Sequence, residues 1–394
     1  GEPEPLTAAS ADTRYADAFI DLMRSRLICV REDHSGSGEA VNTIASINLE
    51  GEDFLDTILV KGNDFYSSPK LSPDGTHLAW LTWNHPSMPW DGCELWVGEI
   101  LPDGSLGNER WVAGGAHESI FQPEWSPAGV LYFASDRNGW WNLQRISGDG
   151  EIETVYMTKG ELGMPQWLFG MSSYAFASDD KIVCSHIEEG ISRLGLFDLT
   201  TKKLTDIDCP FTDIQYLRVS KTKAVFRAGS PTDVASISTY DLETGAIETH
   251  RRSNDQNVFP RYFSVPRPIV FPTESGLTAH GFFYPPQNPD YQAPGNERPP
   301  LIVKSHGGPT ASATTALMLS VQYWTSRGFA VLDVNYGGST GYGRQYRERL
   351  NLKWGIVDVD DCVNGARYLV ARGEVDGGGA RHGHRRRRSF AEGA

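Results

Sequence analysis

A short strand, a polar turn and a second short strand recur five times in the first ~260 residues, and this repeat constrains the fold more than any other feature. The turns follow one another at intervals of roughly 45 to 53 residues, a spacing typical of propeller blades with four strands each. The pattern therefore predicts a β-propeller of which about five blades are visible, and a β-sandwich with long irregular loops is the alternative. The strands that precede the five turns are residues 45–49, 94–100, 141–146, 193–199 and 236–242.

Two of the predicted blades share a second turn, with the sequence Ser-Pro-x-Gly at 72–75 and 126–129. Proline fixes φ at the start of such a turn, and glycine accepts the positive φ that its end requires. An apolar segment follows each turn. The motif therefore predicts a hairpin at the same place in both blades.

The pattern changes after about Arg261, where strands begin to alternate with helices. Residues 269–272 and 279–284 predict a hairpin, and the apolar runs 301–304 and 329–334 predict two further strands. Apolar residues at helical spacing predict two helices, and strand–helix alternation predicts the start of a parallel α/β sheet. The predicted domains are a propeller over 1–262, a partial α/β-hydrolase domain over 263–376 and a tail over 377–394. The apolar helix positions are Leu317, Val321 and Trp324 in the first helix, and Val359, Val363, Ala366 and Val370 in the second.

Charge and cysteine usage exclude several classes of protein. The 394 residues carry a net charge of −14, which repels nucleic acid, and they contain no run of about 18 apolar residues that would cross a membrane. The five cysteines are scattered and never in a CxxC spacing, so neither a disulfide framework nor a zinc site is indicated. We expect a cytoplasmic protein without metal or cofactor, and the sequence leaves its oligomeric state open.

Residues 377–394 break the α/β pattern, because they supply no apolar run for the next strand. They hold five arginines and one glutamate, which would suit a basic tail that binds RNA or membrane phosphates. Gly, Ala, Arg and His also dominate alternate reading frames of GC-rich DNA. We therefore expect an aberrant or non-structural tail.

The segment His306-Gly307-Gly308-Pro309 follows a predicted strand and precedes a predicted helix. An HGG-type loop in this position of an α/β-hydrolase supplies a backbone N–H to the oxyanion hole, and glycine lets the backbone approach the substrate carbonyl. A plain structural turn is the alternative.

Six segments together resemble the prolyl oligopeptidase family of serine peptidases, in particular its acylaminoacyl-peptidase and dipeptidyl aminopeptidase branch. The resemblance implies a propeller that caps an α/β-hydrolase domain and a site that cleaves short peptides. It also implies that the Gly308 N–H is an oxyanion donor and that His306, Gly307, Tyr336 and Ser339 lie in active-site loops. The segments are 14–17 (RYAD), 85–92 (HPSMPWDG), 165–167 (PQW), 306–309 (HGGP), 335–343 (NYGGSTGYG) and 354–362 (WGIVDVDDC).

The sequence departs from that family where the nucleophile is due. After Gly373 such enzymes continue into a strand and a G-x-S-x-G-G elbow, followed by the triad Asp and His, and here residues 377–394 follow instead. We therefore expect a chain truncated at both ends, without the triad and inactive alone. A propeller module that binds peptides or protein partners without catalysis is the alternative function. The sequence does not distinguish acylaminoacyl, dipeptidyl and endopeptidase specificity.

Ser339 is a tempting nucleophile, because residues 337–341 satisfy G-x-S-x-G and Asp358, Asp360, Asp361, His382 and His384 follow in the hydrolase order. The preceding strand comes directly after the HGG strand, which is one strand–helix unit too early for the elbow. The aspartates also open a predicted helix, where the dipole favours carboxylates without any catalytic role. We therefore expect Ser339 to shape the site rather than to attack the substrate.

Other conspicuous residues have structural explanations. His382 and His384 lack a third metal ligand at a fixed spacing, and either Arg14 or Arg137 would suit a substrate carboxylate or a surface ion pair equally well. Aromatic residues in blades are more often core than binding surface. The tryptophans in question are Trp80, Trp83, Trp90, Trp96, Trp140 and Trp141.

Overall fold

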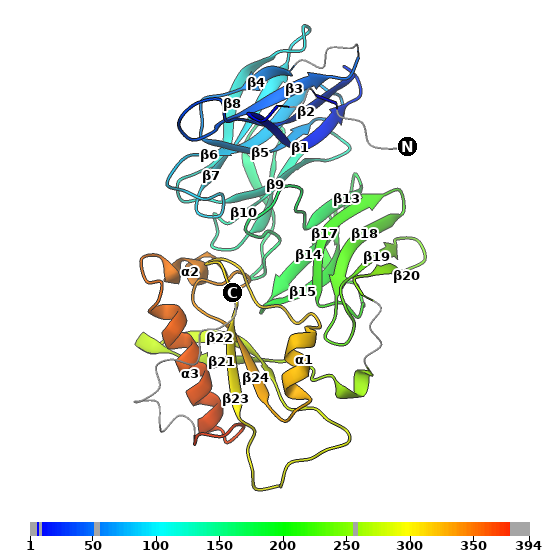
Figure 1. Cartoon of the computed structure of the whole chain (residues 1–394). Helices are drawn as coiled ribbons and strands as arrows, with labels where there is room; N and C mark the ends of the chain where they lie inside the picture. The colour runs from blue at the N-terminus through cyan, green and yellow to red at the C-terminus, as the bar shows by residue number, and fades with distance from the viewer. Residues whose placement is uncertain (1–5, 8–9, 51–55, 255–258, 379–394) are drawn as a thin grey trace. The chain divides into compact units, whose positions relative to one another are not determined.

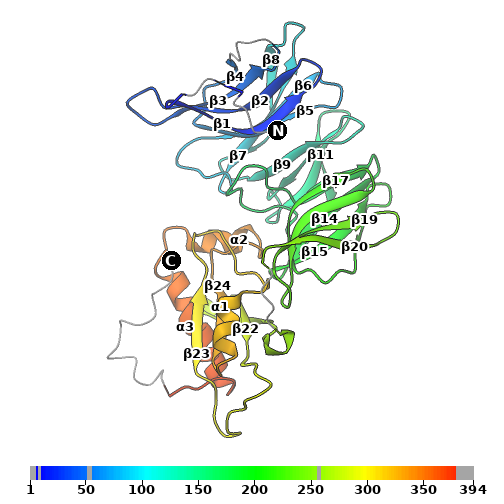
Figure 2. The same ribbon diagram turned by 45° about the vertical axis from the view of Figure 1, so that its right-hand side comes forward.

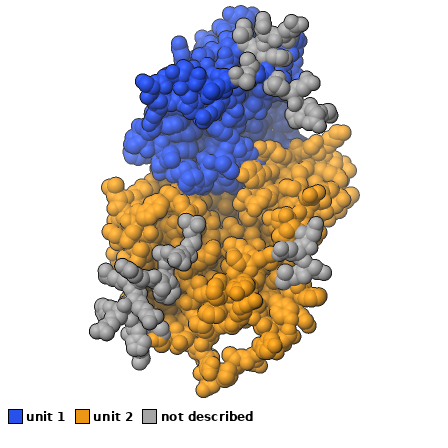
Figure 3. All heavy atoms as spheres, viewed as in Figure 1, with its two compact units in different colours: residues 1–158, 162–184, 197–204 blue, residues 159–161, 185–196, 205–394 orange. Residues whose placement is uncertain are grey.

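The computed structural model describes residues 6–7, 10–50, 56–254 and 259–378, and these form two compact units (Figure 3). Unit 1 comprises residues 1–158, 162–184 and 197–204, and unit 2 comprises 159–161, 185–196 and 205–394. The last blade-like sheet therefore belongs to the same unit as the α/β segment.

Five four-stranded sheets occupy the region up to Arg252, and each sheet takes four consecutive strands in chain order, as propeller blades do (Figure 1). The predicted repeat of four-stranded units is thus confirmed five times among the described residues. The first two sheets contain β1 (Thr13–Asp21), β2 (Arg26–Asp33), β3 (Val41–Asn48) and β4 (Asp56–Val60), then β5 (Phe65–Leu71), β6 (His77–Trp83), β7 (Cys93–Ile100) and β8 (Leu106–Gly115). The next two contain β9 (Ile120–Trp125), β10 (Leu131–Ser135), β11 (Asn142–Ile146) and β12 (Ile152–Tyr156), then β13 (Tyr174–Ser178), β14 (Lys181–Glu188), β15 (Ile191–Asp198) and β16 (Lys203–Asp206). The fifth contains β17 (Asp213–Ser220), β18 (Lys223–Gly229), β19 (Ser236–Asp241) and β20 (Ile247–Arg252).

The repeated turn links the third and fourth strands of each sheet, so the repeat marks the same hairpin in every blade. Aspartate side chains close these turns: Asp198 Oδ1 accepts the N–H groups of Thr200 and Thr201, and Asp241 Oδ1 does the same for the turn before β20. The first turn, at 50–51, lies partly outside the described residues. The Ser-Pro-x-Gly turns join the first and second strands, where Ser72 Oγ accepts the His77 N–H.

The first strand of several sheets carries a β-bulge that sequence periodicity did not reveal. Asp17, Ser68, Gln122 and Tyr216 have φ between 50° and 55°, and the pairing register shifts at each of them. In unit 1 the bulges link neighbouring sheets, because Asp17 Oδ2 accepts the Ser68 N–H at 2.5 Å and Gln122 Nε2 donates to the Tyr174 carbonyl at 2.6 Å.

A mixed sheet follows in unit 2, with the strand order β21-β22-β24-β23 (Figure 1). β21 and β22 form the predicted hairpin, β22 pairs antiparallel with β24, and β23 pairs parallel with β24. The sheet elements are β21 (Arg267–Pro272), β22 (Thr278–Tyr284), β23 (Leu301–Ser305) and β24 (Ala330–Asn335). The helices are α1 (Leu319–Thr325), α2 (Arg344–Arg347) and α3 (Val357–Ala371), with 3-10 turns η1 (Pro260–Tyr262), η2 (Glu274–Gly276) and η3 (Glu348–Leu350).

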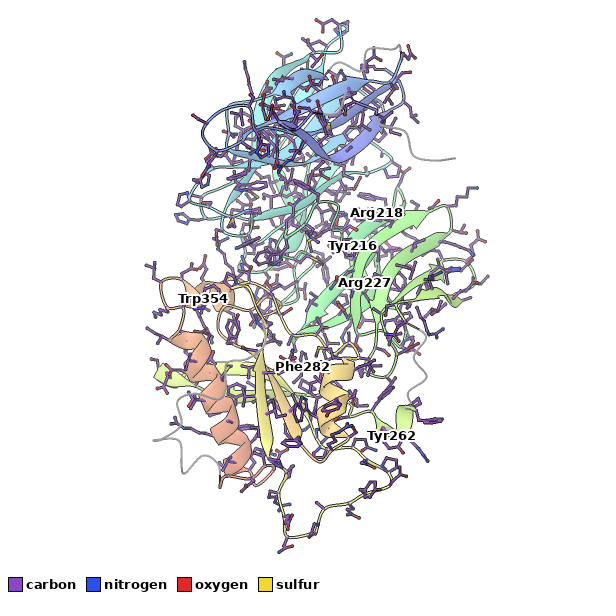
Figure 4. All side chains as sticks on the ribbon, viewed as in Figure 1. Tyr216, Arg218, Arg227, Tyr262, Phe282 and Trp354 are labelled. Carbon is purple, nitrogen blue, oxygen red and sulfur yellow. The ribbon has the colours of Figure 1, made fainter. Side chains whose placement is uncertain are left out.

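Helices α1 and α3 cover opposite faces of this sheet (Figures 1 and 2). Side chains alternate along a strand, so Phe282, which is labelled in Figure 4, packs with Val321 of α1. Phe283 and Leu332 pack with Leu369 of α3. Both clusters are buried. The two helices thus cover the β22, β23 and β24 strands from either side.

The predicted helices exist, and Val321 is buried and Val370 packs against the core as predicted, but other positions predicted to face the core are exposed. Val359 and Val363 are 51% and 41% exposed, and α3 buries Asp361, Gly365 and Leu369 instead. Gly365 is needed at the sheet, because a Cβ there would lie 2.7 Å from Leu332 Cδ2 and 3.0 Å from a Phe271 ring carbon.

The shorter helix α1 starts at Leu319, after Leu317, and its Trp324 is exposed. It buries Val321 and Gln322, whose amide bonds both backbone groups of Ser264 at 2.7 and 3.1 Å. Each helix thus buries residues that the apolar spacing did not predict: Gln322 in α1, and Asp361 and Gly365 in α3.

Candidate active site

The candidate site consists of the two loops that leave the carboxyl ends of β23 and β24. Residues 306–314 follow β23, and residues 336–343 follow β24. Because β23 and β24 are parallel neighbours, both loops leave the sheet at the same edge. All five predicted site residues lie in these loops, and contacts between the two loops involve His306, Gly308, Tyr336 and Ser339.

A short hydrogen bond joins the two loops: His306 Nε2 lies 2.6 Å from Ser339 Oγ. The imidazole also stacks on the ring of Tyr336, with centroids 4.4 Å apart and planes 18° apart. Sequence reasoning did not find this pairing, since 33 residues separate the two side chains.

Burial lowers the pKa of His306 to about 4. Hydrogen bonds to the carbonyls of Gly307 and Gly308 act in the opposite direction, but their effect on the pKa is smaller. The ring is therefore neutral at pH 7 and one of its nitrogens is an acceptor. Ser339 is fully buried, so no substrate carbonyl reaches its hydroxyl in this structure. The bond is suited to holding the loops together rather than to nucleophilic attack.

The carboxylates that follow Ser339 have partners other than His306. Asp361 accepts the Gly337 N–H at 2.7 Å and the Thr273 hydroxyl at 2.5 Å, and Asp358 accepts the Gly355 N–H at 2.7 Å. Burial raises the pKa of Asp361. Asp358 and Asp360 lie in the first turn of α3, as predicted. His382 and His384 lie outside the described residues.

Asn335, at the end of β24, is a second link between the loops that the sequence did not reveal. Its Oδ1 accepts the Ala313 N–H at 2.7 Å, and its Nδ2 donates to the Ala313 carbonyl at 3.3 Å and to the Tyr342 hydroxyl at 2.9 Å. Asn335 is fully buried. Thr340 adds bonds from its N–H to the Ala311 carbonyl and from its hydroxyl to the Thr310 carbonyl. The only sequence signal was a polar residue at the end of an apolar strand.

The glycines of the HGG segment present backbone amides. Gly308 has φ 68°, a left-handed conformation that glycine adopts without strain. Its carbonyl accepts the Tyr336 hydroxyl at 3.2 Å. Within the described part of the chain, neither the Gly307 N–H nor the Gly308 N–H donates to a protein acceptor. A Cβ on Gly307 would meet no atom within 4 Å, so the space on that side of Gly307 is open.

The remaining sequence candidates have structural roles. Trp80, Trp90 and Trp141 are buried in blade cores, and Trp83, Trp96 and Trp140 are half-buried. Arg137 Nε lies 3.0 Å from Glu118 Oε1 in an ion pair, whereas Arg14 is an exposed residue of β1. All five cysteines are free thiols. The described residues contain no cluster of three potential metal ligands and no helix that is both long and apolar enough to span a membrane.

The sequence matches a model of the prolyl oligopeptidase family over residues 315–380. A puromycin-hydrolyzing peptidase from Mycobacterium tuberculosis is 39% identical, with a TM-score of 0.90 over 95% of this chain and 59% of that chain. A crystal structure of puromycin hydrolase is 38% identical, with a TM-score of 0.89 over 95% of this chain and 58% of that one. Prolyl oligopeptidase B from Galerina marginata, at 14% identity and a TM-score of 0.72, shares the fold.

Among curated proteins, the acylamino-acid-releasing enzyme of Sus scrofa is 35% identical over 104 residues, which are 26% of this chain and 14% of that enzyme. Dipeptidyl aminopeptidase BIII of Pseudoxanthomonas mexicana is 35% identical over 74 residues, which are 19% of this chain and 11% of that enzyme. The chain thus spans less than two thirds of these relatives' lengths. The family match over residues 315–380 and the 39% identity across nearly the whole chain thus make this protein similar to members of the prolyl oligopeptidase family.

Proposed function

We propose that this chain is part of a serine-type peptidase of the prolyl oligopeptidase type, with 1–262 as its propeller and 263–376 as the first part of an α/β-hydrolase domain. The N–H groups of Gly307 and Gly308 just after β23 carry the proposal, because neither donates to an acceptor among the described residues. The mixed sheet supports the domain assignment, because a parallel pair flanked by helices on both faces is α/β architecture.

In this proposal the Gly308 N–H is the oxyanion donor, and it acts on the carbonyl oxygen of the scissile bond. A preorganised N–H stabilises the negative charge that develops there in the transition state. Tyr336 holds the Gly308 carbonyl, and His306 and Asn335 hold the loop relative to β24. The donor is therefore positioned before substrate arrives.

Ser339 acts in this proposal as a loop residue and not as the nucleophile. Its complete burial supports this role, as does the absence of a carboxylate bond to His306 among the described residues. The printed sequence holds no other G-x-S-x-G segment. We therefore propose that these 394 residues by themselves do not hydrolyse peptides.

Short peptides are the proposed substrates. One similar structure is a puromycin hydrolase mutant complexed with PGG, and other relatives are named for acylamino-acid release or dipeptidyl aminopeptidase activity. The names of these relatives describe different substrate specificities, so we propose short peptides as a class and no particular peptide. A cytoplasmic, reducing location is part of the proposal, because all five cysteines are free thiols.

A chimaera tests the proposal: residues 1–376 followed by the carboxyl-terminal part of a similar puromycin hydrolase. We expect hydrolysis of short chromogenic peptides. Gly308→Pro removes the N–H and should lower kcat by about 10² to 10³, whereas Ser339→Ala should retain the nucleophile and most of the activity. Because proline is also strained at φ 68°, the melting temperature of each variant is measured alongside. Equal loss of kcat in both variants, or a folded chimaera without activity, would contradict the proposal.

A further inference from the structure

An aromatic pocket in unit 1 shares no lining residue with the candidate active site. It is enclosed by strands of the first two sheets and by the loop 166–169, with a volume of about 280 Å³. Val30 and Tyr66 form a buried part of the pocket wall. Phe65 and Trp83 are half-buried, and their rings stack with centroids 5.5 Å apart. The aromatic residues are Phe65, Tyr66, Trp83, Trp167 and Phe169.

Three polar side chains line the same pocket: Glu32, Asn42 and Gln166. Asn42 is only 7% exposed, and its Nδ2 donates to the Asp64 carbonyl at 2.7 Å. No hydrogen bond to its Oδ1 is seen among the described residues, so this oxygen is available as an acceptor.

The surroundings of the pocket favour a positive ligand. Glu32 is a lining residue whose carboxylate bonds only His34, at 3.1 Å, among the described residues. His85, whose ring lies 5.0 Å from that of Phe65, is flanked by the carboxylates of Asp64 at 3.1 Å and Glu39 at 3.7 Å. The described lining includes neither Lys nor Arg.

We propose that this pocket binds the guanidinium or ammonium side chain of a peptide, with arginine preferred. Aromatic faces attract a cation through their quadrupole, and a planar guanidinium also stacks on tryptophan. The apolar stem of the side chain lies along Phe65 and Trp83, and Glu32 and the Asn42 oxygen accept from its head. A volume of about 280 Å³ suits a single long side chain rather than a larger ligand.

The loop 166–169 closes the pocket and is held by hydrogen bonds that leave its apolar side chains exposed. Gln166 accepts the Ser67 hydroxyl at 3.3 Å and donates to the Ser68 hydroxyl at 3.3 Å. The Trp167 ring contacts that of Trp90 in a tilted arrangement, with centroids 4.3 Å apart, yet Trp167 and Phe169 remain 44% and 43% exposed. These exposed rings are available to cover the stem of a bound side chain. The proposal does not depend on peptidase activity, because binding is measured without turnover.

Calorimetric titration of the 394-residue chain with two blocked peptides tests the proposal. The peptides are acetyl-Gly-Arg-Gly-amide and its citrulline analogue, which is nearly isosteric and uncharged. We expect the arginine peptide to bind at least about tenfold more tightly, because one desolvated cation contact is worth about that factor. Raising the salt concentration should narrow the difference.

Three variants locate the site. Glu32→Gln should reduce the arginine preference to about two- or threefold and leave citrulline binding unchanged, and Trp167→Leu should weaken both peptides by about threefold or more. Glu151→Gln, an exposed position of unit 1 outside the pocket, makes the same change of net charge and should alter neither. Equal affinity for the two peptides, no binding at millimolar concentration, or equal effects of Glu32→Gln and Glu151→Gln would each overturn the proposal.

Discussion

His306 Nε2 lies 2.6 Å from Ser339 Oγ, and this contact joins the loops that follow two parallel neighbouring strands. A serine and a histidine at this distance usually suggest a nucleophile and its base. Here the serine is fully buried, and the other ring nitrogen of His306 lies beside the Gly307 carbonyl and the Tyr336 hydroxyl, both at 3.3 Å. The pair therefore fixes the loop that carries the Gly308 amide.

Ser339 should not react with a fluorophosphonate probe in the folded chain, because its hydroxyl is inaccessible. We expect no serine labelling above background when the 394-residue chain is incubated at pH 7.5 and analysed by mass spectrometry. Ser339→Ala is the matched control. Labelling of the wild-type chain that this substitution abolishes would establish Ser339 as a nucleophile and refute its structural role.

Replacing Asn335 should destabilise unit 2, because both backbone groups of Ala313 and the Tyr342 hydroxyl lose a buried partner. We expect Asn335→Ala to lower the free energy of unfolding by about 2 to 4 kcal/mol, measured by urea denaturation. Asn351→Ala, at an exposed position just after η3, should change it by less than about 0.5 kcal/mol. Equal effects of the two substitutions would show that Asn335 does not hold the loops.

The His306 ring should titrate near pH 4 in the folded chain, below its usual value of 6.5, because burial disfavours the charged form. The unfolded chain then binds more protons between about pH 6.5 and pH 4, so the free energy of unfolding falls as the pH falls through that window. The loss is at most about 1.4 kcal/mol per pH unit for one group.

NMR titration of the His306 C2 proton, assigned by its disappearance in His306→Asn, measures this pKa directly. The slope of stability between pH 6.5 and 4.5 should also be smaller in that variant. A measured pKa of 6 or above would show that the ring is hydrated and that the loop pair is open in solution.

Enlarging Gly365 should push α3 away from the sheet, since a Cβ already meets Leu332 at 2.7 Å and Phe271 at 3.0 Å. We expect Gly365→Val to cost about 1 to 3 kcal/mol by overpacking, measured as a shift in the urea midpoint. Val359→Ala, on the exposed face of the same helix, should change stability by less than about 0.5 kcal/mol. A stabilised Gly365→Val variant would mean that the helix is less closely packed than described.

The sequence by itself determined the features that depend on local interactions. The five blade hairpins are encoded by turns such as that at Asp198, where one carboxylate accepts the N–H groups of the residues two and three positions later. Such a turn can be predicted from the residue types at neighbouring positions. The same holds for the β21–β22 hairpin, for the parallel strands and for the position of the HGG segment between a strand and a helix.

Tertiary structure alone decided which side chains meet across long separations in the chain. Apolar spacing placed Val359 and Val363 in the core, yet α3 buries Asp361 and Gly365, because a hydrogen bond to Gly337 and a close approach to Leu332 fix the orientation of the helix. The contact between His306 and Ser339 likewise requires β23 and β24 to be paired first. Sequence periodicity reports an average preference for burial, whereas specific polar contacts and steric fit select among the faces that it allows.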